Sequence, residues 1–207
     1  MLFGFVLAVA IIQTPPITTE MNVTYGAQNI GSARVTQTYR PDGSKFIQLR
    51  MDLQANGNKL TIVQESEYDS LGRPLRKYAR QTGAGGGEMV TVTFKDGVAS
   101  VVSEKDGKRE TKKLPIPPNS DYRSQAEFWF AKIKPPIGTS INYVRFDINT
   151  REWVASTVTY RGKENLKVGG KSVAANRVDM DNLQSWVDDA GNPIRLIMGQ
   201  FVLVKKT

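Results

Sequence analysis

The sequence predicts a mainly β protein, a curved antiparallel sheet or incomplete barrel of about ten strands, with one aromatic α-helix packed on its concave face. Three observations support this fold class. Apolar and polar residues alternate in short runs, turn dipeptides separate these runs, and a single segment between them has helical spacing. The 207 residues are enough for one large domain that folds without disulfides or metal ions.

The first residues resemble a secretory signal. Leu2–Ile12 is almost entirely apolar and is followed by Pro15-Pro16. This run is shorter than the about 20 residues that a helix needs to cross a bilayer, and it matches the hydrophobic part of a signal peptide. We therefore expect residues 1–14 to be a signal peptide, 15–29 to be an extended segment, and 30–207 to form a single β domain. A buried first strand remains the alternative.

Strands are predicted where apolar residues recur at every second position. Ile47–Leu53 places four apolar side chains on one face, and residues 90–94 and 154–160 repeat the pattern. The run Ile194–Val204 is nearly continuous in apolar residues, which is typical of one central strand. Turn sequences separate these runs, and they favour tight hairpins because their residues accept positive φ. They are Pro41-Asp42-Gly43, Asn56-Gly57, Asp96-Gly97, Asp106-Gly107, Gly169-Gly170 and Gly191-Asn192.

One segment, 120–133, has the spacing of an amphipathic helix. Tyr122, Ala126, Trp129, Phe130 and Ile133 fall on one helical face, and prolines bound the segment on both sides. A lone helix with so many aromatic residues must bury that face, and the concave side of the sheet is the expected place.

Two stretches of the sequence recur. Thr36–Arg40 is repeated at Thr157–Arg161, and Ser66–Arg76 shares its Ser, Asp, Gly, Pro and Arg with Ser185–Arg195 at identical spacing. This pattern fits duplicated meanders at 30–100 and 140–207 that flank the helix. It equally fits one favourable turn chemistry used twice, since Asp, Gly and Pro each promote a specific part of such a turn.

The composition excludes much chemistry. With neither Cys nor His there can be no disulfide, thiol nucleophile, zinc finger or Ser-His-Asp triad. Gly169–Ser172 lacks the glycine that a phosphate loop requires five residues before its second glycine. The one common enzyme class left open is a glycan hydrolase with two carboxylates. The carboxylates considered are Glu65, Glu67, Asp69, Glu127 and Asp147; the sequence certifies no pair among them, and Glu127 and Asp147 are the two to test. We expect no enzyme, no cofactor and no metal.

Two sets of residues are candidates for binding. The first would line an apolar site between helix and sheet: Met51, Leu53, Phe94, Trp129, Phe130, Ile133 and Tyr160. The second is a basic hairpin that would attract a polyanion, in keeping with the net charge of +8: Lys105, Lys108, Arg109, Lys112 and Lys113. Ordinary core packing is the favoured interpretation of each residue in the first set, and protection of a sheet edge is the favoured interpretation of the second.

An exported meander with an aromatic helix resembles the lipoprotein-carrier superfamily of bacterial envelope proteins and related uncharacterised periplasmic β-rich families. The resemblance rests on Gly43–Asp52, Tyr68–Pro74 and Trp186–Pro193, and it covers about residues 30–207. In the carriers the helix precedes most of the sheet, whereas here it lies in the middle of the chain.

The resemblance implies a half-open barrel that holds acyl chains under a helical lid. The predicted function is therefore a non-catalytic extracytoplasmic protein that binds a lipid or lipoprotein acyl group. The alternative is a structural module with a filled core that binds an anionic envelope polymer. We expect a monomer with no stable membrane span and no nucleic-acid partner.

Overall fold

The computed structural model describes residues 15–55, 57–84, 86–118, 120 and 135–207. The strands of the first part are β1 (Ile17–Tyr25), β2 (Gln28–Tyr39), β3 (Lys45–Ala55), β4 (Asn58–Tyr68), β5 (Pro74–Gly83), β6 (Gly86–Lys95), β7 (Val98–Lys105) and β8 (Lys108–Pro115). Those of the second part are β9 (Ser140–Asp147), β10 (Glu152–Val168), β11 (Lys171–Met180), β12 (Leu183–Val187), β13 (Pro193–Met198) and β14 (Phe201–Lys205).

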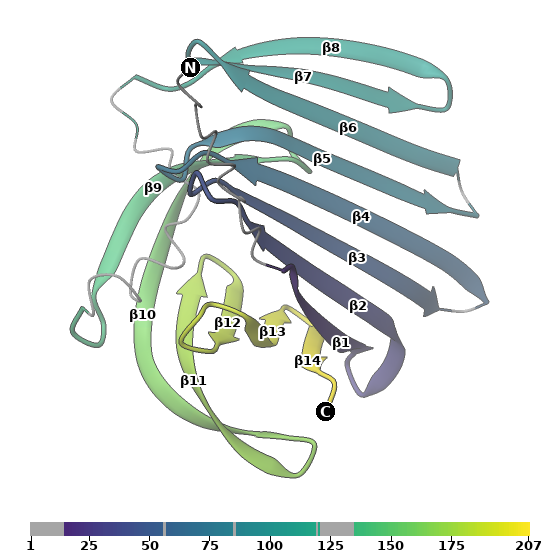
Figure 1. Cartoon of the computed structure of the whole chain (residues 1–207). Helices are drawn as coiled ribbons and strands as arrows, with labels where there is room; N and C mark the ends of the chain where they lie inside the picture. Colours follow the sequence, from purple (N-terminus) through teal and green to yellow (C-terminus); the bar gives the residue numbers. More distant parts are fainter. Residues whose placement is uncertain (1–14, 56, 85, 119, 121–134) are drawn as a thin grey trace, which may run out of the picture.

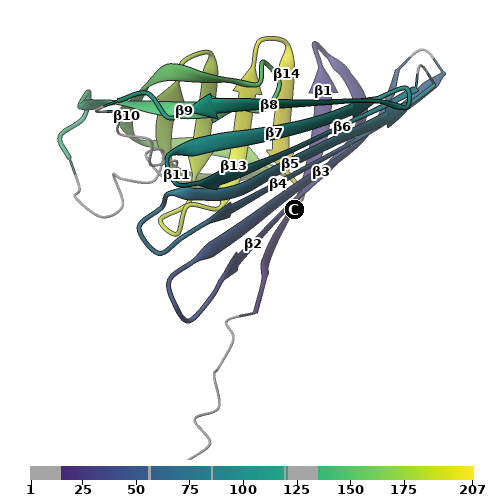
Figure 2. The ribbon, with the colours of Figure 1, turned by 90° about the horizontal axis from the view of Figure 1, so that it is seen from above.

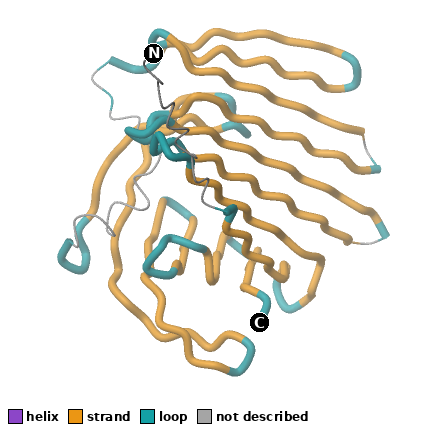
Figure 3. The backbone as a smooth tube through the Cα atoms, in the orientation of Figure 1, coloured by secondary structure: helices purple, strands orange, loops and turns teal. Residues whose placement is uncertain are grey.

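All fourteen strands belong to one antiparallel sheet, as the alternating sequence pattern predicts. Their order is β8-β7-β6-β5-β4-β3-β2-β1-β14-β13-β12-β11-β10-β9, so only the pairing of β1 with β14 joins strands distant in sequence. The sheet is rolled, with β9 and β10 returning towards β5 and β6 (Figures 1 and 3). In Figure 2 the strands β3–β8 run at a steep angle to β11–β14, as expected of a long twisted sheet.

The predicted fold class was wrong in two respects. The sheet has fourteen strands instead of about ten, and the described residues contain no helix. One cause of the low strand count is Ile194–Val204, which forms two strands because Gly199, with φ of +60°, turns the chain inside the apolar run. A second is the largely polar β1, which the hydrophobic pattern did not reveal.

The segment predicted as the aromatic helix lies outside the described residues from position 121 onward. In the described part of the chain, no helix is long and apolar enough to cross a bilayer.

The main core lies on the inner face of the rolled sheet. On β1 and β2 this face carries Met21, Val23 and Ala33, which are at most 2% exposed and pack with Leu203 of β14. The same face of β9–β12 carries a second cluster: Tyr143, Val158, Val178 and Val187. On the opposite, outer face of β1 and β2, Glu20 and Arg34 form an exposed ion pair. This division into apolar and polar faces follows from the period of two.

The ends of the rolled sheet overlap. Phe146 of β9 points to the face opposite Tyr143, and there it packs on inner-face residues of β6 and β7. Its ring meets Phe94 and Trp153 edge to face, at centroid distances of 5.6 and 5.3 Å. We call this contact the seam; it comprises Val90, Val92, Phe94, Ala99 and Val101 of β6 and β7 with Phe146 and Trp153 of β9 and β10.

The long strand β10 changes direction at a β-bulge. The bulge lies between Tyr160 and Gly162, where φ of +98° and the closeness of Ile137 leave no room for a larger residue. Beyond it, the β10–β11 hairpin contributes Val168 and Ala175 to a small outer core that also contains Trp186, Ile194, Ile197 and Val204.

The recurring sequence stretches form turns of the same geometry. Asp69 accepts hydrogen bonds from the backbone N–H groups of Leu71 and Arg73 at 2.9 and 2.8 Å. Asp188 accepts the equivalent bonds from Ala190 and Asn192 at 2.9 and 2.8 Å. In both hairpins a bulge lies just before the aspartate.

Candidate functional site

The inner face changes character between β1 and β4. On β1 and β2, Met21, Val23 and Ala33 are buried, although Ile30 and Val35 are partly exposed, whereas the inner-face aliphatic residues of β3 and β4 are all partly exposed. We call the latter the apolar strip; it consists of Leu49, Met51, Leu53, Leu60 and Ile62. A filled core would bury such side chains, since each removal from water is worth about 1.5–3 kcal/mol. The strip is therefore the part of the inner face with apolar surface available to a ligand.

A cavity of about 230 Å³ adjoins this strip. It lies between the inner face of β4–β6 and the turn that joins β9 to β10. Its apolar lining comes from Ile62, Val90 and Ile148, and its polar lining includes Gln64 and Arg151. The cavity therefore combines an apolar patch with several polar and charged side chains that could orient a ligand.

A second cavity, of about 280 Å³, lies on the other side of Arg151 and Glu88, which line both cavities. Its lining is mainly charged and includes Lys105, Lys108 and Glu110 of the β7–β8 hairpin. A larger depression of about 590 Å³ lies at the tips of the β3–β4, β5–β6 and β7–β8 hairpins. It lies at the strand ends, and of the apolar strip only Leu60 lines it, so we place the candidate site at the two smaller cavities, which lie beside Arg151 and the seam.

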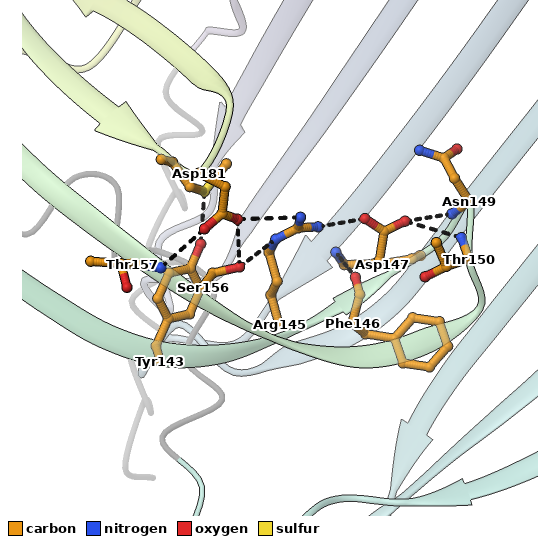
Figure 4. Close-up of polar contacts among 11 residues, drawn as sticks. Tyr143, Arg145, Phe146, Asp147, Asn149, Thr150, Ser156, Thr157 and Asp181 are labelled. Carbon is orange, nitrogen blue, oxygen red and sulfur yellow. Dashed lines mark hydrogen bonds and ion pairs between the residues drawn. The ribbon is translucent and has the colours of Figure 1, made fainter. Parts of the chain in front are cut away.

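The β9–β10 hairpin that closes the site is held by a polar network around Arg145 (Figure 4). Its guanidinium donates to Asp147 and to Ser156, each at 2.8 Å, and lies 3.6 Å from Asp181. Ser156, which is 3% exposed, in turn donates to Asp181 at 2.8 Å. Lys77 of β5 donates to the carbonyl of Phe146 at 2.8 Å, which ties the edge strand β9 to the opposite wall. The network positions the hairpin.

Asp147, one of the carboxylates considered for a hydrolase, is held ionised by this network. Burial works against its ionisation, but hydrogen bonds from Arg145 and from the amides of Thr150 and Asn149 outweigh burial, and the pKa of Asp147 is lowered. A general acid at neutral pH requires a raised pKa. Glu127, its predicted partner in a hydrolase, lies outside the described residues.

The predicted ligand-binding residues fall in different places. Met51 and Leu53 belong to the apolar strip. Phe94 lies in the seam, and Tyr160 packs on the Tyr143 cluster while its hydroxyl donates to Asn176 at 3.1 Å. The other three, Trp129, Phe130 and Ile133, lie outside the described residues.

The predicted basic residues lie on the exposed β7–β8 hairpin at one end of the sheet. Because successive residues of a strand point to opposite faces, they divide into two groups. Lys105, Lys108 and Lys112 lie on the inner face, whereas Arg109 and Lys113 lie on the outer face. Among the described residues, no group of three acidic side chains could hold a metal ion.

Sequence reasoning missed the charged residues where the two ends of the sheet meet. Arg151 forms an ion pair with Glu88, 63 positions away, and donates to Ser103 at 3.3 Å, 48 positions away. Neither spacing corresponds to a motif, because the contact arises only when the sheet rolls. The strand alternation could have placed Glu88 and Ser103 on one face, but not opposite Arg151.

Comparisons with known proteins identify the fold and no function. No protein-family model matches the chain, and no curated protein sequence matches it significantly. Among solved structures, it is similar to a beta-barrel-like protein of the domain of unknown function DUF1849 from Brucella abortus, with a TM-score of 0.62 and 11% identity over 96% of both chains. It also matches a DUF1089 family protein from Pseudomonas aeruginosa, with a TM-score of 0.41 and 12% identity over 85% of this chain and 93% of that one.

The DUF1849 neighbour agrees with the expected likeness to an uncharacterised β-rich family. It does not confirm the resemblance to lipoprotein carriers.

Proposed function

We propose that this chain is an exported, non-catalytic protein that binds the apolar part of an envelope lipid or lipoprotein on the inner face of its sheet. The observation that carries this proposal is the partial exposure of the apolar strip, next to a cavity lined by Ile62, Val90 and Ile148. The apolar N-terminal run supports export.

The expected mechanism is burial of hydrocarbon against the strip. Each methylene removed from water contributes about 0.8 kcal/mol, so a long acyl chain can bind without any specific polar contact. The inner face of the rolled sheet supports this mechanism. Its aliphatic residues on β3 and β4 are more exposed than Met21, Val23 and Ala33 on β1 and β2.

A fluorescent fatty-acid probe tests the proposal. The purified chain should take up the probe, and Ile62→Gln should weaken uptake several-fold because it places a polar group on the strip. Val63→Gln is the matched control: it is the next residue on the same strand but faces outward, so it should bind the probe as the unmodified chain does. Urea unfolding of both variants would verify that they fold.

The alternative function predicts a different response. A module that binds an anionic polymer should lose binding steeply as salt increases, whereas acyl burial should change little. Failure of the chain to take up the probe, together with salt-sensitive binding of a polyanion, would overturn the proposal in favour of the alternative.

A further inference from the structure

Arg151 occupies a backbone conformation that arginine disfavours. It lies in the turn between β9 and β10 with φ of +60°, and its N–H donates to the carbonyl of Asp147 at 2.8 Å. The other described non-glycine residues with positive φ are Asp96, Asp106 and Asp181. Aspartate tolerates this region, whereas arginine has no local hydrogen bond that compensates for it. The side chain of Arg151, rather than its backbone preference, accounts for arginine at this position.

The guanidinium of Arg151 lies between the two cavities of the candidate site. One Nη pairs with Glu88, the other donates to Ser103, and the buried Nε has no hydrogen-bond partner. The side chains of Arg151 and Glu88 are 31% and 36% exposed, so a solute can reach the pair. The ion pair separates the cavity that contains Ile62, Val90 and Ile148 from the charged one.

A row of inner-face residues leads from this ion pair to the core. By the strand register, Glu88 is opposite Gln81, Gln81 opposite Ile62, Ile62 opposite Met51, and Met51 opposite Ala33. Gln81 is exposed, Ile62 and Met51 are partly exposed, and Ala33 is buried. With strands about 4.8 Å apart, the row spans about 19 Å, which is comparable with an extended long acyl chain. It is charged at one end and apolar at the other.

We infer that Arg151 binds the carboxylate headgroup of an anionic amphiphile whose hydrocarbon chain lies along this row. Glu88 occupies the position of that carboxylate in the ligand-free chain and gives it up when the ligand binds. Arginine suits this role because its planar guanidinium binds a carboxylate through two parallel hydrogen bonds. Lys105 and Lys108 line the second, charged cavity, which is the side from which the headgroup would approach. This inference rests on the proposed function and specifies its ligand class.

Two matched probes test the assignment: cis-parinaric acid, at a pH where it is ionised, and the corresponding neutral alcohol. The unmodified chain should bind the acid about tenfold more tightly than the alcohol, since one charge-assisted contact distinguishes the two. Arg151→Asn, which suits positive φ, should bind both probes equally. Glu88→Gln should increase the affinity for the acid, because it removes the competing carboxylate. Arg34→Asn, on the outer face, is the control and should retain the preference.

The outcomes separate this inference from the proposed function. If the chain binds neither probe, the proposed function fails. If it binds acid and alcohol equally, or if Arg151→Asn retains the preference for the acid, the assignment of Arg151 fails and the proposed function stands. Should Arg151→Asn not fold, Glu88→Gln still decides, because an unchanged affinity for the acid in that variant would overturn the assignment.

Discussion

The rolled sheet is held together at two places by different means. Between β1 and β14 the contact is a hydrogen-bonded ladder of five residue pairs, from Met21 with Lys205 to Tyr25 with Phe201. Between β6 and β9 no ladder forms, because β7 continues the sheet from β6 and occupies its edge. There the ends overlap face to face at the seam through side-chain packing, and Lys77 of β5 donates to the carbonyl of Phe146.

This difference explains where the candidate site lies. A ladder fixes the register of its strands and brings their inner-face side chains into one packed cluster, as Val23 and Leu203 show. Where the ends overlap, they touch only where side chains meet. Beyond the seam, the inner face of β4–β6 and the β9–β10 turn are therefore separated. The cavities on either side of Arg151 lie at that boundary. Contacts made by a few side chains are also easier to break than a ladder.

The largest expected effect is therefore at the seam. Phe146→Ala removes a ring that is 1% exposed and contacts both Phe94 and Trp153, and we expect it to lower the free energy of unfolding by about 3–5 kcal/mol. Phe201→Ala is the comparison at the ladder. That residue is partly exposed and its backbone remains paired, so the loss should be about half as large or less.

Urea unfolding of the two variants measures this contrast. Equal losses, or a larger loss for Phe201→Ala, would show that the seam is not the side-chain-dependent contact described above.

An intermediate effect is expected at the two equivalent turns. Asp69→Ala and Asp188→Ala each remove an acceptor of two backbone hydrogen bonds, so each should cost about 1–2 kcal/mol. Asp42→Ala, whose side chain accepts one such bond, from Ser44 at 2.8 Å, should cost less. Thermal or urea unfolding of the three variants would test this order. A clear difference between the free energies lost in Asp69→Ala and Asp188→Ala would show that the two turns share a geometry but not an energetic role.

Local features of the fold were predictable because they depend on neighbouring residues. The alternation in Ile47–Leu53 corresponds to β3, and the turn signals at Asp96-Gly97 and Asp106-Gly107 fall at the hairpins β6–β7 and β7–β8. The positive φ of Asp96 and Asp106 shows why those pairs were informative. The strand β1 was not predicted because Thr19 interrupts the apolar residues of its inner face and because its burial depends on β14, some 180 positions away.

The candidate site was predictable only in part. Met51 and Leu53 lie on the inner face because alternation determines the face of each residue. Arg151 and Glu88 could not be paired, because their contact depends on how far the sheet rolls and on β7 and β8 blocking its closure. That is a property of the whole chain and leaves no local pattern in the sequence.

The smallest expected effect is the pH dependence that Asp147 contributes to the β9–β10 hairpin on the seam side of the molecule. The pKa of Asp147 is lowered in the folded chain, so its contribution to stability is complete above its ordinary pKa of about 3.9 and is lost as the pH falls below that value. Asp147→Asn keeps an oxygen for the amides of Asn149 and Thr150 but loses the charge facing Arg145, and it should cost less than about 1 kcal/mol at neutral pH. The variant should then lose less stability than the unmodified chain on acidification. Hydrogen exchange should locate the acid-sensitive opening in β9 and β10 and find β1 and β14 protected to lower pH. If the two chains lose stability in parallel, or if β1 and β14 open first, the charge of Asp147 does not secure the hairpin that closes the site.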